Sequence, residues 1–181
     1  MYSERILEIF KNPTNAGGLQ GSQGIGKYID EATGDYYKIY LKLDETETII
    51  GAHFKTMGSV GAIVASSALC SELVNLTIED AKEVNEETIV KVTGEYPEDK
   101  KQTLTYAINA LKSAIEEYYI QKEKAEKNGE TLFAKAKPQK EKVEKKTTKK
   151  TVETNKEENN NEKQVSKAKA NFDAMFEAWN D

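Results

Sequence analysis

Apolar and polar residues alternate along residues 36–43. The apolar side of this stretch consists of Tyr37, Ile39, Leu41 and Leu43. Lys38 and Lys42 fall on the opposite side, and this period of two is typical of a half-buried β-strand. A second alternating stretch follows an acidic turn at 44–48, and its inward side is expected to be Ile50, Ala52 and Phe54. With a partner strand at 26–31, the pattern predicts an antiparallel meander.

After residue 58 the hydrophobic pattern becomes helical. Residues 60–75 are apolar on nearly all sides, which predicts a helix buried on most of its surface, with Ser59 as its N-cap. The further helices predicted are a short one from Ser3 to about residue 10, short turns at 77–82 and 86–92, and a long one from Pro97 to about residue 126. Strands first and helices after predict an α+β fold, with a small antiparallel three-stranded sheet packed against several helices on one face.

Charge divides the chain into three parts. Residues 1–133 carry 14 basic and 22 acidic side chains, and residues 134–167 carry 11 lysines and 6 glutamates. The basic stretch has no aromatic residue, Leu or Ile, so it cannot bury enough surface to offset its ordering entropy. We therefore expect a domain at 1–133, a disordered linker at 134–165 and a short amphipathic helix at 166–181.

The C-terminal segment is the part of the chain outside the domain with a clear apolar stripe. Its large apolar residues at helical spacing, the expected partner-binding residues, are Phe172, Met175, Phe176 and Trp179. A helix this short is marginal alone in water, so it is expected to dock either on its own domain or in a groove of a partner.

Composition excludes several classes of function. The single cysteine, Cys70, and the single histidine, His53, cannot build a thiolate cluster, a His-rich metal site or a nucleophile–base pair. We expect Cys70 to be a buried, inert thiol and His53 to be exposed on the polar face of its strand. The linker lacks the arginine and aromatic residues typical of nucleic-acid binding. These absences predict a cytoplasmic, non-enzymatic protein that contacts neither nucleic acid nor membrane.

Several motifs in order along residues 1–120 resemble one family. The matching segments are Tyr2-Ser3-Glu4-Arg5-Ile6-Leu7 with Asn12-Pro13, then Thr33-Gly34-Asp35, then Phe54-Lys55-Thr56-Met57-Gly58-Ser59, then Thr77-Ile78-Glu79-Asp80-Ala81. They resemble the U-type iron–sulfur cluster scaffold proteins, the NifU N-terminal domain and its IscU-like relatives. Thr33-Gly34-Asp35 falls where that family has Cys-Gly-Asp, and Gly58-Ser59 falls where it has Gly-Cys.

The resemblance implies a site for a nascent [2Fe–2S] cluster, built from three cysteines and one aspartate. The corresponding positions in this chain are Thr33, Asp35, Ser59 and Thr103. All three cysteines are replaced and only the carboxylate remains. Because clusters need anionic thiolates and neutral hydroxyls are far poorer ligands, the expectation is that no cluster, iron or other metal is bound.

The substituted positions also have structural interpretations. Ser59 suits a helix N-cap, Thr103 either caps the long helix or faces solvent, and Asp35 accepts hydrogen bonds from turn amides. The sequence thus predicts a scaffold-like protein that has lost cluster binding and acts as a non-catalytic binding or regulatory partner in iron–sulfur assembly, with a cysteine desulfurase as a candidate partner. Two alternatives stay open: a working iron or iron–sulfur scaffold that uses Asp35 with non-standard ligands, and an adaptor that reuses the fold for an unrelated task.

Overall fold

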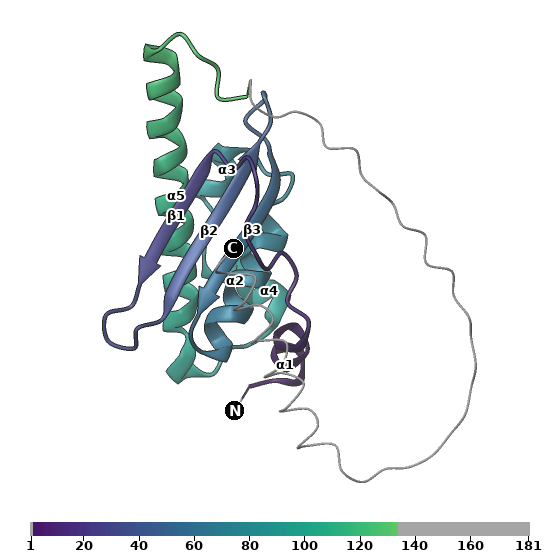
Figure 1. The fold of residues 1–181 in the computed structure, drawn as a ribbon. Helices are drawn as coiled ribbons and strands as arrows, with labels where there is room; N and C mark the ends of the chain where they lie inside the picture. Colours follow the sequence, from purple (N-terminus) through teal and green to yellow (C-terminus); the bar gives the residue numbers. More distant parts are fainter. Residues whose placement is uncertain (1, 134–181) are drawn as a thin grey trace, which may run out of the picture. The chain divides into compact units, whose positions relative to one another are not determined.

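The computed structural model describes residues 2–133 and contains one antiparallel sheet of three strands, in the order β1-β2-β3 (Figure 1). The elements are α1 (Glu4–Lys11), β1 (Gly24–Ile29), β2 (Tyr36–Leu43), β3 (Ile49–Met57), α2 (Val60–Leu73), α3 (Ile78–Lys82), α4 (Glu86–Thr93), the 3₁₀ turn η1 (Glu98–Lys100) and α5 (Gln102–Lys127). Helices α5 and α2 lie on the same side of the sheet, behind it in Figure 1. The predicted α+β fold is confirmed.

The predicted linker at 134–165 and the predicted helix at 166–181 lie outside the described residues, and so do Phe172, Met175, Phe176 and Trp179. The domain boundaries drawn from the sequence therefore stay predictions. Across residues 2–133, no helix combines the length and apolar character needed to cross a lipid bilayer.

Two serines begin helices as the sequence predicts. The Oγ of Ser3 accepts a hydrogen bond from the amide of Ile6 at 3.3 Å, and the Oγ of Ser59 accepts one from the amide of Ala62, also at 3.3 Å. Each bond satisfies one of the amides that the first turn of a helix leaves without a partner. Helix α2, which Ser59 caps, is buried along almost its whole length, as expected from its all-round apolar pattern.

The inward side of β3 differs from the prediction at one residue. Ala52 and Phe54 are buried as expected, but Ile50 is 51% exposed and its neighbour Ile49 is fully buried. The cause is an irregularity in the pairing of β2 with β3, where Lys42 is opposite Gly51 while Leu43 is opposite Ile49. This β-bulge adds one residue to β3 and turns Ile50 outward.

The long helix begins later than predicted. Pro97 precedes the 3₁₀ turn η1, and the regular helix α5 starts only at Gln102. Proline and the acidic pair after it do form a helical turn, but the chain tightens into i→i+3 bonding before the α-helix is established. At the other end, α2 stops at Leu73, two residues before the predicted end, and Asn75 adopts a positive φ of 74°.

The outer side of the sheet, which faces away from α2 and α5, is partly covered by the loop between α1 and β1. A Cβ on Gly51 would lie 3.2 Å from the Cδ2 of Leu19, so this loop lies against the sheet there. His53 is only partly exposed, and its Nδ1 is a buried atom without a hydrogen-bond partner within residues 2–133. The prediction that His53 is exposed is therefore wrong, because folding brings a distant loop over its strand.

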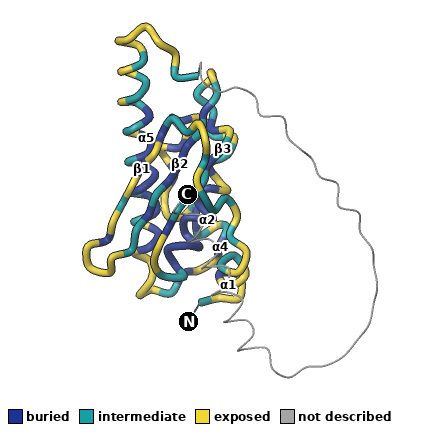
Figure 2. The backbone as a smooth tube through the Cα atoms, viewed as in Figure 1, coloured by how far each residue is buried: buried dark blue, intermediate teal, exposed yellow. Residues whose placement is uncertain are grey.

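Helix α5 rests directly on the backbone of β1, and the buried core lies between the sheet and the helices (Figure 2). A Cβ on Gly26 would lie 2.1 Å from the carbonyl oxygen of Ala110 and 2.1 Å from the amide nitrogen of Ala114. No other residue type leaves room for that approach. Gly26 therefore allows α5 to pack closely on the sheet and fixes the point along β1 at which the helix backbone makes contact.

Candidate functional site

Three chain segments that are distant in sequence meet at one end of the sheet. They are the β1–β2 turn with Thr33 and Asp35, the β3–α2 junction at Ser59, and the first turn of α5 with Thr103. The contacts described below link Thr33, Asp35 and Ser59, and they place Thr103 beside Gly61 in the first turn of α2. The fold therefore brings these residues together, although 70 residues separate the first from the last.

The carboxylate of Asp35 is held at the N-terminus of α2. Its Oδ2 accepts hydrogen bonds from the Oγ of Ser59 at 3.1 Å and from the Ser59 amide at 3.4 Å. Gly58 has a φ of +155°, and a Cβ there would lie 2.5 Å from the Cγ of Asp35. The expectation that Asp35 bonds turn amides holds in part, since the amide it contacts belongs to a helix start 24 residues away.

Thr33 organises the turn between β1 and β2. Its hydroxyl donates to Oδ2 of Asp30 at 2.5 Å and accepts a hydrogen bond from the amide of Asp35 at 3.3 Å. The bond from Thr33 is the main reason why the pKa of Asp30 lies below its ordinary value. The Thr33 side chain therefore serves the turn itself.

Thr103 is 7% exposed and α5 has no side-chain cap hydrogen bond, so both expectations for it, exposure to solvent and a cap, are wrong. Its hydroxyl donates to the carbonyl oxygen of Lys100 at 2.7 Å, across the junction between η1 and α5. A Cβ on Gly61 would lie 3.0 Å from this same hydroxyl oxygen, which places Thr103 beside the first turn of α2. Thr103 of α5 therefore lies beside Gly61, which is two residues after Ser59 in the chain.

Three tyrosines of the site were not found by sequence reasoning. The hydroxyl of Tyr2 accepts a hydrogen bond from the amide of Gly61 at 3.2 Å, and that of Tyr96 donates to the Gly61 carbonyl at 3.2 Å. Tyr37 is fully buried, and its hydroxyl has no hydrogen-bond partner among residues 2–133. Burial, and then the nearby carboxylates, raise the pKa of Tyr37. A tyrosine in an apolar pattern looks like a core residue, so only its surroundings reveal the polar role.

The donor set does not fit an iron–sulfur cluster. It consists of one carboxylate already bonded to Ser59 and of hydroxyls that are neutral at pH 7. Cys70, the single cysteine, is fully buried in α2, and burial raises the pKa of its thiol, in agreement with the predicted inert role. In the described part of the chain, no group of three or more His, Cys, Asp or Glu residues has the spacing of a metal site.

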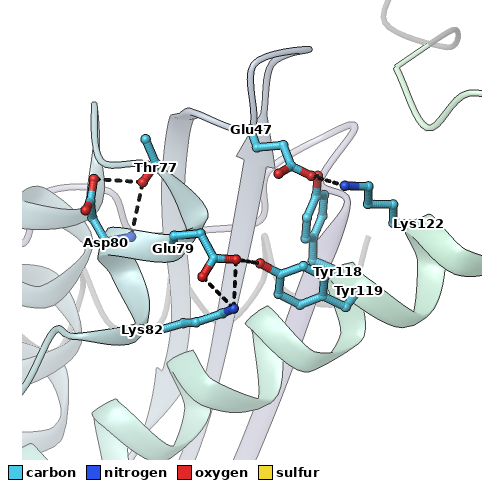
Figure 3. Close-up of polar contacts among 8 residues, drawn as sticks. All are labelled: Glu47, Thr77, Glu79, Asp80, Lys82, Tyr118, Tyr119 and Lys122. Carbon is cyan, nitrogen blue, oxygen red and sulfur yellow. Dashed lines mark hydrogen bonds and ion pairs between the residues drawn. The ribbon is translucent and has the colours of Figure 1, made fainter.

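A second polar cluster lies towards the other end of α5 (Figure 3). Glu47, in the β2–β3 turn, accepts a hydrogen bond from the hydroxyl of Tyr118 at 2.8 Å and pairs with Lys122. Glu79 of α3 accepts a hydrogen bond from Tyr119 at 2.5 Å. The bond from Lys122, followed by that from Tyr118, holds the pKa of Glu47 below its ordinary value.

Comparisons with known proteins agree with this architecture. Residues 1–125 match the family model of the NifU-like N terminal domain. The nitrogen fixation protein NifU of Azotobacter chroococcum is 34% identical over 118 residues, which cover 65% of this chain and 38% of that protein. The iron–sulfur cluster assembly scaffold protein IscU 1 of Archaeoglobus fulgidus is 30% identical over 144 residues, which cover 80% of this chain and 94% of that protein.

The fold has counterparts among solved structures. The N-terminal part of a NifU-like protein from Brucella abortus superposes with a TM-score of 0.50 over 65% of this chain and 94% of that chain, at 15% identity. Such low identity supports a shared fold alone. The chain spans less than half the length of the Azotobacter NifU protein but nearly all of the Archaeoglobus scaffold.

Proposed function

The chain belongs to the family of NifU-like N-terminal domains, and from this premise we propose that it acts in iron–sulfur cluster assembly as a scaffold-like protein that no longer holds a cluster. In this proposal it is not an enzyme and carries no cofactor. It works by binding other proteins of the assembly pathway, among which a cysteine desulfurase is the first candidate.

The state of Asp35 is the observation that supports this proposal most directly. Its carboxylate accepts two hydrogen bonds from Ser59, one from the hydroxyl and one from the amide at the start of α2. A carboxylate at a helix N-terminus is stabilised by the orphan amides and the dipole there. To coordinate iron, Asp35 would have to give up bonds that Ser59 provides, and no thiolate in residues 2–133 could share the metal with it.

The remaining site hydroxyls are also engaged in the fold. Thr33 bonds Asp30 within the turn, and Thr103 bonds Lys100 across the start of α5. Ser and Thr side chains commonly form such local hydrogen bonds near turns and helix ends. They support a site that has been converted from metal binding to structural support.

Anaerobic reconstitution tests this proposal. The purified chain is incubated with ferrous iron, sulfide and a thiol reductant, desalted, and assayed for visible absorption, iron and acid-labile sulfide. The expected result is a colourless protein with no stoichiometric iron or sulfide. A reproducible absorption band with matching iron and sulfide would contradict the loss of cluster binding.

A working scaffold that uses oxygen ligands is the second candidate. It is favoured by the retained Asp35 carboxylate and by the buried hydroxyl of Tyr37, which lacks a hydrogen-bond partner within residues 2–133. Under this candidate, Asp35→Ala and Tyr37→Phe would each release bound iron. Under our proposal neither variant changes the iron content, which is already negligible.

Partner binding is tested separately from metal binding. In a pull-down with a purified cysteine desulfurase, the full chain is expected to be retained. Trp179→Ala in the predicted C-terminal helix is expected to weaken the complex by about 2 kcal/mol, because large aromatic side chains dominate binding energies. Absence of binding to the desulfurase and to other assembly proteins would favour the adaptor that reuses the fold for an unrelated task.

A further inference from the structure

The outer side of the sheet carries a band of basic residues that the sequence pattern did not reveal. The pairing of the strands places Lys27 opposite Lys38, and Lys38 opposite Lys55. Neighbouring strands lie about 4.8 Å apart, so the three lysines form one row across the sheet. We call Lys27, Lys38 and Lys55 the lysine row.

An exposed apolar row lies next to the lysine row. Ile29 is opposite Tyr36, and Tyr36 is opposite Met57. Ile29 is 57% exposed and Met57 is 43% exposed, and they are the last residues of the two edge strands, β1 and β3. Together they form an apolar patch at that end of the sheet. Each row lies two residues from the other along every strand, a separation of about 7 Å. We call Ile29, Tyr36 and Met57 the apolar row.

Charge on this face contrasts with charge on the rest of the domain. Residues 1–133 contain 22 acidic and 14 basic side chains, yet the outward positions of the three strands carry lysines and no acid. No ion pair within residues 2–133 involves Lys27 or Lys38; the ammonium group of Lys38 lies over the ring of Tyr40, 4.9 Å from its centroid. Like charges directly opposite one another destabilise a sheet. A bound anionic group would relieve the repulsion between Lys27 and Lys38.

We propose that the two rows form a docking surface for an acidic amphipathic helix of a partner protein. The rows run across the strands, and three strands span about 10 Å, which two turns of a helix cover at 1.5 Å per residue. A helix about 10 Å wide placed over the apolar row reaches the lysine row with its flank. Its apolar stripe would cover Ile29 and Met57, and its acidic residues would face Lys27 and Lys38.

Single-stranded nucleic acid is a less suitable occupant of this face. Binding of unpaired bases relies on accessible aromatic rings for stacking. The ring of Tyr40 cannot serve, because Tyr40 is 8% exposed and Lys38 lies over it. The most exposed residues of the apolar row are aliphatic or thioether side chains, which suit the apolar stripe of a helix.

The apolar row adjoins the cluster-like site, since Tyr36 follows Asp35 and Met57 lies two residues before Ser59. Peptide binding and metal content are measured separately, so failure of this inference and failure of the proposed loss of cluster binding are distinguishable. The test uses the full chain and a fluorescein-labelled synthetic peptide of 18 residues, with Leu at helical spacing and Glu on both flanks of the stripe. Control peptides carry Lys in place of Glu, or keep the composition in scrambled order. Binding is measured by anisotropy at low and at moderate salt.

The acidic amphipathic peptide is expected to bind, with affinity that falls as salt increases, and both control peptides are expected to bind at least tenfold more weakly. The variant Lys27→Glu/Lys38→Glu should weaken binding at least tenfold, and Lys27→Gln/Lys38→Gln should have an intermediate effect. Ile29→Thr, which keeps a β-branched residue in the strand, should weaken binding about tenfold. Circular dichroism verifies that each variant is folded.

The matched control is Lys91→Glu/Lys124→Glu, which makes the same charge change at exposed positions of α4 and α5. It should change affinity less than twofold. Absence of peptide binding, or equal loss in the two double variants, would overturn the proposal. Tighter binding of an oligo-thymidine strand or of phosphatidylserine vesicles than of the peptide would also overturn it, in favour of those ligands.

Discussion

The two ends of α5 are joined to the rest of the domain in different ways. At its start, Thr103 bonds Lys100, three residues earlier in the chain. Towards its end, Tyr118 bonds Glu47, 71 residues away, and Tyr119 bonds Glu79, 40 residues away. The first end carries Thr103, one of the four positions that the family resemblance singled out, and the second end carries carboxylates paired with tyrosine and lysine.

Long-range polar contacts contribute differently to the fold at the two ends of α5. At the Tyr118 end, long-range bonds tie the β2–β3 turn and α3 to the helix, and removal of a partner would leave a buried hydroxyl unsatisfied. At the Thr103 end, local bonds such as Thr103 to Lys100 stand beside a longer-range bond from Ser59 to Asp35, 24 residues apart. The hydroxyls of Thr33, Ser59 and Thr103 at that end all take part in hydrogen bonds of the fold.

The largest expected effect comes from restoring cysteines at the Thr103 end. The variant Thr33→Cys/Ser59→Cys/Thr103→Cys is expected to take up zinc or a [2Fe–2S] cluster to near stoichiometry, because the fold already brings these positions together and thiolates are strong ligands. Metal content and visible absorption after anaerobic reconstitution measure this.

A control places the same three cysteines at exposed hydroxyl positions that lie apart, with Thr46→Cys/Ser71→Cys/Thr105→Cys. This variant should bind no stoichiometric metal. If the first variant is folded and binds no more metal than the control, the residues assigned to the ligand positions are wrong.

The next largest effect is on stability and concerns the packing of α5 on β1. Gly26→Ala is expected to destabilise the domain by at least about 3 kcal/mol, because its Cβ would overlap the backbone of α5. Urea unfolding followed by circular dichroism measures this. Gly18→Ala is the control, since its Cβ would meet nothing closer than 3.6 Å; a change there should stay within about 0.5 kcal/mol.

Removal of single hydroxyl groups, one from Tyr118 and one from Ser59, is expected to lower the free energy of unfolding by a smaller amount. Tyr118→Phe is expected to cost about 1–2 kcal/mol, because it removes the bond to Glu47 from a fully buried ring. Ser59→Ala is expected to cost about 1 kcal/mol through loss of the α2 cap. Urea unfolding of the single variants and of the double variant measures both. Costs that are not additive would mean that Ser59 and Tyr118 are energetically coupled.

The smallest effect is a dependence of stability on pH. The pKa values of Asp30 and Glu47 lie below their ordinary values, so both groups stabilise the fold above about pH 4.5. This stabilisation is lost as the pH falls through the folded-state pKa values. Urea midpoints measured from pH 7 to pH 3 should therefore decline only below about pH 4.5. Asp30→Asn and Glu47→Gln should each flatten the decline, and a decline that begins near pH 6 would contradict this assignment.

Local patterns in the sequence account for much of the fold and for part of the site. The strand at 36–43 and the caps Ser3 and Ser59 depend on neighbours within a few residues, so alternation and capping rules predict them. The bulge that exposes Ile50 and the loop that covers His53 depend on contacts between distant segments. The lysine row likewise follows from strand register, which the sequence pattern left undetermined.

The site was predictable from the family resemblance more than from physical pattern. The motifs around Asp35 and Ser59 indicated which residues meet, and the structure brings them into hydrogen-bonding distance. Tyr2, Tyr37 and Tyr96 carried no comparable signal, because a tyrosine hydroxyl acquires its role from the backbone or carboxylate that folding places beside it.

Gly58 shows how a residue without a side chain can determine the position of a charge. The space that a Cβ would fill at Gly58 is occupied by the carboxyl group of Asp35. Any larger residue at position 58 would therefore displace the Asp35 carboxylate from the start of α2 and break its hydrogen bonds to Ser59. The position of the Asp35 carboxylate therefore depends on Gly58 as well as on residue 35 itself. A variant designed to bind metal at this site must keep both residues.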